Sequence, residues 1–170
     1  MLRPNPWLNG ASYIPHELDF RGRLYGIPHF NFAREDQIRG LFLFADGEPI
    51  GDEGLLWLKA HVAKCAGSNS NLNFEQRVAW TDQNIDRIYD VAERALRCEP
   101  IPDLPDDPIQ YIAACIELKQ ALDQGPDFIT RLPVTFDGSC SGLQHLCAMT
   151  GAEEGRYVNL LNGNAGRDDI

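Results

Sequence analysis

The sequence lacks the features that mark secreted, membrane-spanning and disulfide-stabilised proteins. Its five cysteines are an odd number without a C-x-x-C pair. Neither a disulfide framework nor a structural zinc site is therefore predicted, and we expect buried, reduced thiols. The longest apolar run, residues 40–45, falls far short of the ~20 residues that a membrane-spanning helix needs. The N-terminus carries no signal or transit peptide pattern. These absences disfavour a membrane protein and a secreted protein, and reduced thiols favour the cytoplasm.

The charge pattern shows no overall basic excess. The 170 residues have a net charge of −10, which by itself argues against a nucleic-acid partner. The charge is uneven, however: residues 41–128 carry sixteen acids against seven Lys and Arg, while residues 1–40 carry five Arg against four acids. A local basic strip near the N-terminus is therefore compatible with the composition. With 44% apolar residues, the chain can form one packed domain.

The first third of the chain is predicted to be extended and then helical. Residues 11–32 hold β-formers broken by Pro and Gly. Apolar residues at positions 38, 41, 42 and 45 have the spacing of one helical face. Asp52 is predicted to cap a helix of about three turns that stops at Gly67.

The middle of the chain is predicted to be mainly helical. Asn73 and Gln76 form a capping-box pattern that opens a helical region running to about Leu96, with a break near Asp82. Asp107 and the proline after it are a cap and a first-turn proline for a buried helix over 109–122.

The last third is predicted to form a strand, a turn and a helix. Residues 129–136 have the pattern of a strand, residues 137–142 that of a turn, and residues 143–149 that of a helix. The fold class is therefore α+β, rich in helix and with a short antiparallel sheet.

The turn after this strand could carry chemistry. A carboxylate at the end of a buried strand, Asp137, is followed by Gly138, whose backbone stays accessible. One carboxylate and one carbonyl oxygen suit a hard cation such as magnesium. The alternative is that Asp137 only caps the turn and the helix that follows it. A second alternative makes Cys140 the nucleophile of a hydrolase, at the tip of a strand-to-helix elbow. A cysteine nucleophile needs a histidine base, and His145, five residues further on in the helix that follows, is poorly placed to face the thiol.

A second motif, residues 19–25 (DFRGRLY), combines two arginines, a glycine and a tyrosine. Arg21 and Arg23 offer forked donors for phosphate oxygens, and Tyr25 offers a ring for stacking. Asp19 is placed to orient the guanidinium groups. The alternative is a surface Asp–Arg pair in a turn.

Together these motifs resemble the single-subunit, phage-type DNA-directed RNA polymerases, a family that also includes the mitochondrial enzymes. Residues 19–25 match the family's D-x-x-G-R element, and residues 136–145 (FDGSCSGLQH) match polymerase motif A. Residues 39–51 and 54–61 match the helices between these motifs. The resemblance covers nearly the whole chain. Cys65-Ala-Gly and Ser141 favour the phage branch, whose enzymes work in the host cytoplasm.

The resemblance implies a role for each matched residue. Asp137 would ligate both catalytic magnesium ions, helped by the carbonyl of Gly138. The D-x-x-G-R motif would contact the DNA template and the RNA–DNA hybrid through Arg21, Gly22, Arg23 and Tyr25. Three residues after Asp137 would lie near the nucleotide or the hybrid: Ser139, Ser141 and Gly142. The implied partners are a DNA template, an RNA product, ribonucleoside triphosphates and the remainder of the polymerase chain.

The resemblance also implies that the chain is an incomplete polymerase palm. Residues 1–33 would hold the strands with the D-x-x-G-R element, residues 34–128 a mainly helical part, and residues 129–170 the motif A strand, turn and helix. The fingers helix and the second catalytic aspartate of the family do not occur in these 170 residues, so we expect no activity from the chain alone. A non-catalytic module that binds nucleic-acid backbone is the alternative function.

Overall fold

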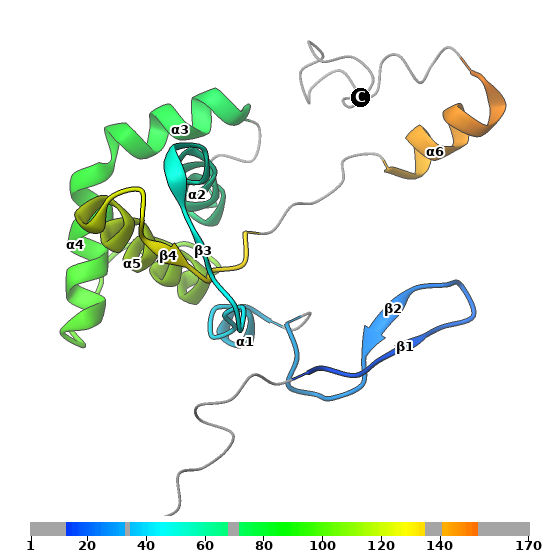
Figure 1. Ribbon diagram of the computed structural model, residues 1–170, viewed down its shortest axis with the longest axis horizontal. Helices are drawn as coiled ribbons and strands as arrows, with labels where there is room; N and C mark the ends of the chain where they lie inside the picture. Colours follow the sequence, from blue (N-terminus) through cyan, green and yellow to red (C-terminus); the bar gives the residue numbers. More distant parts are fainter. Residues whose placement is uncertain (1–12, 33–34, 68–71, 135–140, 153–170) are drawn as a thin grey trace, which may run out of the picture.

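The computed structural model describes residues 13–32, 35–67, 72–134 and 141–152 (Figure 1). The elements in chain order are β1 (His16–Leu18), β2 (Leu24–Gly26), α1 (Asp36–Arg39), β3 (Glu48–Pro49), α2 (Gly51–Cys65), α3 (Phe74–Gln83), α4 (Ile85–Leu96), α5 (Pro108–Gln124), β4 (Ile129–Thr130) and α6 (Ser141–Thr150). Strands β1 and β2 form one antiparallel pair, and β3 and β4 form another. The predicted α+β class, rich in helix and with short antiparallel sheets, is confirmed.

Helix α5 lies at the centre of the hydrophobic core. It packs against α1, α2 and α4, whereas α3 packs mainly on α2 (Figure 1). The fully buried side chains of α5 include Tyr111, Cys115 and Leu118. They meet Leu58 and Val62 of α2 and further apolar side chains of α4 in one cluster. The prediction that this helix is buried is therefore confirmed for one face, and the side chains on its other faces are partly or fully exposed.

Helices α3 and α4 begin and break where the sequence predicts. Asn73 accepts a hydrogen bond from the backbone N–H of Gln76, and the Gln76 side chain accepts one from the backbone N–H of Asn73. This reciprocal pair is the predicted capping box. The break between the two helices lies at Asn84, close to the predicted position.

Helix α1 is much shorter than the predicted helical face. It ends at Arg39, and residues 42–44 are not helical. A Cβ on Gly40 would lie 2.9 Å from the carbonyl carbon of Ile109, so only glycine fits where α1 ends against α5. The backbone N–H of Phe44 then bonds the carbonyl of Arg131 at 2.9 Å. The apolar spacing therefore reflects a helical turn followed by chain that is not helical.

The N-terminus of α5 is capped by a residue distant in sequence. Asp107 is the N-cap residue, but its side chain makes no cap hydrogen bond. Instead, the carboxylate of Asp36 accepts the backbone N–H groups of Ile109 (2.7 Å) and Gln110 (2.9 Å). The prediction that the Asp107 side chain caps α5 is therefore wrong, because the Asp36 carboxylate accepts these hydrogen bonds instead. Asp52 is likewise not a cap, because the N-cap residue of α2 is Ile50 and Asp52 lies in the first turn.

We expect the Asp36→Ala variant to lower the free energy of unfolding by about 1–2 kcal/mol, the usual cost of losing a helix cap. The loss follows because the backbone N–H groups of Ile109 and Gln110, at the start of α5, would lose the carboxylate that accepts their hydrogen bonds. Urea denaturation followed by far-ultraviolet circular dichroism measures it. Asp107→Ala is the matched control, and an equal or larger loss in that variant would contradict the assignment of the cap.

A two-stranded antiparallel sheet joins the segment before α2 to the segment after α5, so it links both ends of the helical body formed by α2 to α5. Glu48 of β3 pairs with Thr130 of β4, and Pro49 pairs with Ile129. Only two residues of the predicted strand over 129–136 are in β4, residues 131–134 are not in a strand, and residues 135–136 lie outside the described part. The short length follows from β3, which ends where α2 begins.

The cysteines differ in exposure. Cys115 and Cys147 are buried, Cys65 is half-buried and Cys98 is exposed, and all four are free thiols. The expectation of buried thiols is therefore wrong for Cys98. This residue follows α4 with a φ of 56°, in the turn that leaves the helix.

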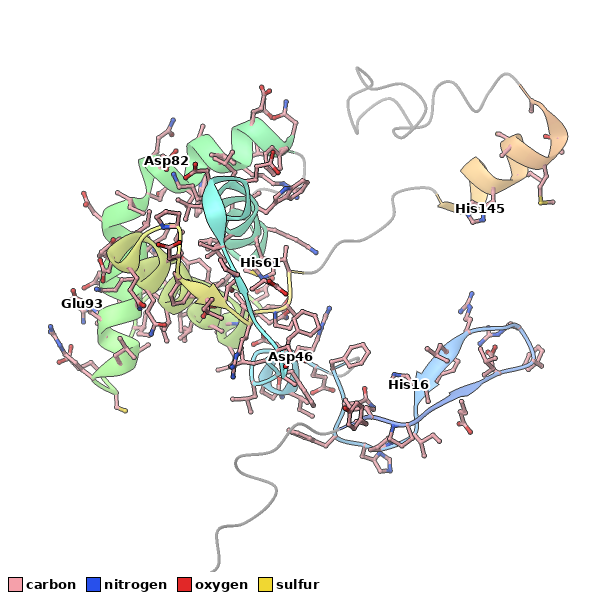
Figure 2. The ribbon with its side chains drawn as sticks, viewed as in Figure 1. His16, Asp46, His61, Asp82, Glu93 and His145 are labelled. Atoms are coloured by element: carbon pink, nitrogen blue, oxygen red, sulfur yellow. The ribbon has the colours of Figure 1, made fainter. Side chains whose placement is uncertain are left out.

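His61 of α2 is a buried titratable side chain (Figure 2). It is 5% exposed, and its Nε2 lies 3.6 Å from Sγ of Cys65, one turn further along α2. Burial, reinforced by the charge of Lys64, lowers the pKa of His61 to about 4. The imidazole is therefore neutral in the folded protein at neutral pH.

Stability should therefore depend on pH through His61. In the unfolded chain its pKa returns to about 6.5, so between pH 6.5 and 4 unfolding takes up a proton and the free energy of unfolding falls as the pH falls. We expect the wild type to lose about 2 kcal/mol more than His61→Gln between pH 7 and 5. Urea denaturation at both pH values measures the difference, and equal losses in the two proteins would contradict it.

Candidate nucleic-acid interface and catalytic strand

The segment with the two arginines forms a hairpin. In β1 and β2, Glu17 pairs with Tyr25 and Leu18 with Leu24, so residues 19–23 form the connecting turn. The backbone N–H of Asp19 bonds the carbonyl of Arg23, and the N–H of Gly22 bonds the carbonyl of Asp19, both at 3.0 Å. Gly22 has a φ of 75°, which favours glycine at this position.

The carboxylate of Asp19 organises the turn. Its Oδ1 accepts the backbone N–H groups of Arg21 and Arg23, each at 2.9 Å, and its Oδ2 accepts the Nε–H of Arg21 at 2.9 Å. The hydrogen bond from the Arg23 backbone, followed by those from Arg21, lowers the pKa of Asp19 against the opposing effect of its desolvation. The carboxylate is therefore ionised at neutral pH.

The two arginine side chains have different surroundings. The guanidinium of Arg21 also contacts the Tyr25 hydroxyl, with 3.3 Å from Nη2 to oxygen, and lies 5.4 Å from the centroid of the Phe20 ring. The Arg23 side chain is exposed and has no hydrogen-bond or ion-pair partner among the residues that the structure describes. The prediction that Asp19 orients a guanidinium is confirmed for Arg21. For Arg23, Asp19 accepts only the backbone N–H.

The chain that leads toward Asp137 is anchored to the helical body. Glu117 of α5 accepts hydrogen bonds from the Thr130 hydroxyl at 2.6 Å and from the Arg131 backbone N–H at 3.4 Å. On the other side, the N–H of Ile50 bonds the carbonyl of Phe128 at 2.8 Å. These bonds fix the course of the chain up to Arg131.

Helix α6 follows the predicted turn. It begins at Ser141, two residues before the predicted start, and Gly142 and His145 are exposed. Figure 2 labels His145 on this helix. Asp137, Gly138 and Ser139 lie outside the described residues, as does Cys140, so the roles assigned to them stay predictions. No hydrogen bond or ion pair within the described ranges joins α6 to the hairpin.

Several residues that shape this region were not predicted. Asp36 and Glu117 act on partners distant in sequence, and neither has a local motif that indicates its role.

The described residues contain no group of three or more His, Cys, Asp and Glu side chains that could hold a metal ion. No helix within the same ranges is long and apolar enough to cross a membrane.

Comparisons with known proteins place these motifs in a family. Residues 48–170, most of the chain, match the family model of the DNA-dependent RNA polymerases. The mitochondrial DNA-directed RNA polymerase of Schizosaccharomyces pombe is 41% identical over 158 residues, which cover 91% of this chain and 14% of the relative. The chloroplastic/mitochondrial polymerase 2B of Nicotiana tabacum is 41% identical over 161 residues, covering 92% of this chain and 16% of the relative. The polymerase of Enterobacteria phage T3 is 39% identical over 163 residues, covering 93% of this chain and 18% of the relative.

The chain thus spans about a sixth of the length of these relatives. The matched part nevertheless includes Asp137 and helix α6, and the relatives come from a phage and from organelles. The chain belongs to the single-subunit, phage-type family of DNA-dependent RNA polymerases.

Proposed function

We propose that this chain is part of the palm of a DNA-directed RNA polymerase. The whole enzyme would transfer nucleotides from ribonucleoside triphosphates to an RNA 3′ hydroxyl on a DNA template. The observation that carries the proposal is the family match over residues 48–170, which includes the segment with Asp137. The remainder of the polymerase would be the main partner of the helical body.

Asp137 and Gly138 would hold magnesium. A carboxylate and a backbone carbonyl are hard oxygen donors, and magnesium prefers such donors while it leaves positions for water and phosphate. When bound, magnesium neutralises charge that develops on the attacking and leaving oxygens of a phosphoryl group. The anchoring of Thr130 and Arg131 by Glu117 supports the proposal, because it ties the chain that leads to Asp137 to the rigid core.

The hairpin would contact the template and the RNA–DNA hybrid. Arg21, Arg23 and Tyr25 are exposed side chains on one turn and its following strand, and Gly22 between the arginines lets a nucleic-acid backbone approach. Arginine is suited to phosphate because its planar fork donates two parallel hydrogen bonds. Ser139, Ser141 and Gly142 would lie near the nucleotide or the hybrid.

RNA synthesis by the full-length polymerase that contains residues 1–170 tests this proposal. We expect template-directed product from ribonucleoside triphosphates in the presence of magnesium. Absence of product on templates with and without promoters would overturn it. The isolated chain should make no RNA. On the basis of the phage-branch residues Cys65 and Ser141, we propose that the full-length polymerase works in the cytoplasm.

A non-catalytic backbone-binding module is the second candidate, and the exposed Arg23 favours it. In that case the isolated chain would bind DNA with a strong dependence on salt, and the full-length protein would bind DNA without synthesis.

A further inference from the structure

We propose that the two arginines of the hairpin have different tasks. Arg23 is the main contact to a nucleic-acid phosphate, whereas the exposed Arg21 is paired with Asp19, which acts as a positioning residue. The inference rests on the proposed function of the hairpin as a contact to nucleic acid, and it separates two residues that the motif alone treats alike.

Arg21 is already engaged. Its Nε donates to Asp19 at 2.9 Å, its Nη2 donates to the Tyr25 hydroxyl at 3.3 Å, and its guanidinium lies 5.4 Å from the centroid of the Phe20 ring. The carboxylate balances its charge within the turn. A phosphate at this position would meet a guanidinium that an anion already contacts.

Arg23 has the opposite arrangement, a fixed backbone and an available side chain. Its N–H donates to Oδ1 of Asp19 at 2.9 Å, and its carbonyl accepts the N–H of Asp19 at 3.0 Å. Its guanidinium is exposed and takes no partner within the ranges that the structure describes. A fixed backbone reduces the conformational entropy that binding must remove, and all of the guanidinium donors remain free for a phosphate.

Asp19 creates this difference because its two oxygens act separately. Oδ1 holds the backbone of the turn, and Oδ2 holds the Arg21 side chain. In Asp19→Asn the amide oxygen could still accept both backbone N–H groups, but the amide nitrogen could not accept the Nε–H of Arg21. This variant would therefore keep the turn and release Arg21.

The salt dependence of nucleic-acid binding tests the inference. The affinity of the full-length polymerase for a template with a short annealed RNA is measured at several salt concentrations. Affinity falls as salt rises, and the slope is the magnitude of the fall in log affinity per unit of log salt. Each phosphate that a cation neutralises adds about 0.7–0.9 to this slope. We expect Arg23→Gln to lower the slope by about one and the affinity in 0.1 M salt roughly five- to tenfold. Arg21→Gln is the matched change and should lower the slope clearly less than Arg23→Gln does.

Asp19→Asn should raise the slope by about one, because the released Arg21 gains a phosphate contact. The double variant Asp19→Asn with Arg21→Gln should remove that gain. A decrease of the slope in Asp19→Asn would overturn the positioning role. If Arg21→Gln lowers the slope as much as Arg23→Gln, the division of tasks is wrong while the hairpin still binds nucleic acid. If neither variant changes the slope, the hairpin is not a nucleic-acid contact, and the proposed function of this element fails with the inference.

Discussion

The Asp137→Asn variant of the full-length polymerase is expected to lose RNA synthesis by several orders of magnitude while template binding stays nearly unchanged. The amide has almost the shape of the carboxylate, so the turn should keep its form. It is neutral, however, and a neutral oxygen binds a divalent cation far more weakly than a carboxylate does. Primer extension in the presence of magnesium measures synthesis, and a gel-shift titration measures template binding.

A second readout separates the metal role from a structural one. Titration with Mn²⁺, followed by electron paramagnetic resonance, should show weaker ion binding in Asp137→Asn than in the wild type. Asp127→Asn is the matched control, because it makes the same change at an exposed residue ten positions earlier in the chain. An active Asp137→Asn enzyme, or one with unchanged Mn²⁺ binding, would show that Asp137 only caps the turn.

The Leu118→Ala variant is expected to lose about 2–5 kcal/mol of the free energy of unfolding. Leu118 is fully buried on α5, the helix that packs against α1, α2 and α4. Its truncation removes apolar contacts and leaves a cavity that the surrounding helices can fill only in part. Urea denaturation followed by circular dichroism measures the loss.

Leu96→Ala is the control for this core variant. It makes the same chemical change on α4, where the side chain is 60% exposed, and it should change stability by less than about 0.5 kcal/mol. Similar losses in the two variants would contradict the central place of α5. Because α5 also holds the chain toward Asp137 through Glu117, a loosened core should lower synthesis in the full-length enzyme as well.

The features that the sequence predicts correctly depend on neighbours in the chain. The capping box at Asn73 and Gln76 involves residues three positions apart, and Pro108 starts α5 because it suits the first turn of a helix. Asp19 and Arg21 are two residues apart, so their pairing could be predicted from the motif. The family could be predicted for a different reason: the motifs at 19–25 and 136–145 match it in order and separation.

The features that the sequence predicts wrongly depend on contacts between distant segments. The apolar spacing from Ile38 onward is equally compatible with a longer helix, and only the contact of Gly40 with α5 and the bond from Phe44 to Arg131 end it. Asp107 has the residue type of a cap, yet Asp36 takes the hydrogen bonds because α1 lies against the start of α5.

By itself, the sequence determined the α+β class, the starts of α3, α5 and α6 to within two residues, and the membership of the family. These follow from short-range hydrogen bonding, from the helical period of the apolar residues and from the motifs. Only the tertiary structure decided which carboxylate caps α5 and how far the strand after α5 extends. Both depend on the acceptor that a backbone donor finds nearest in space, and donors choose among acceptors by distance and direction rather than by position along the chain.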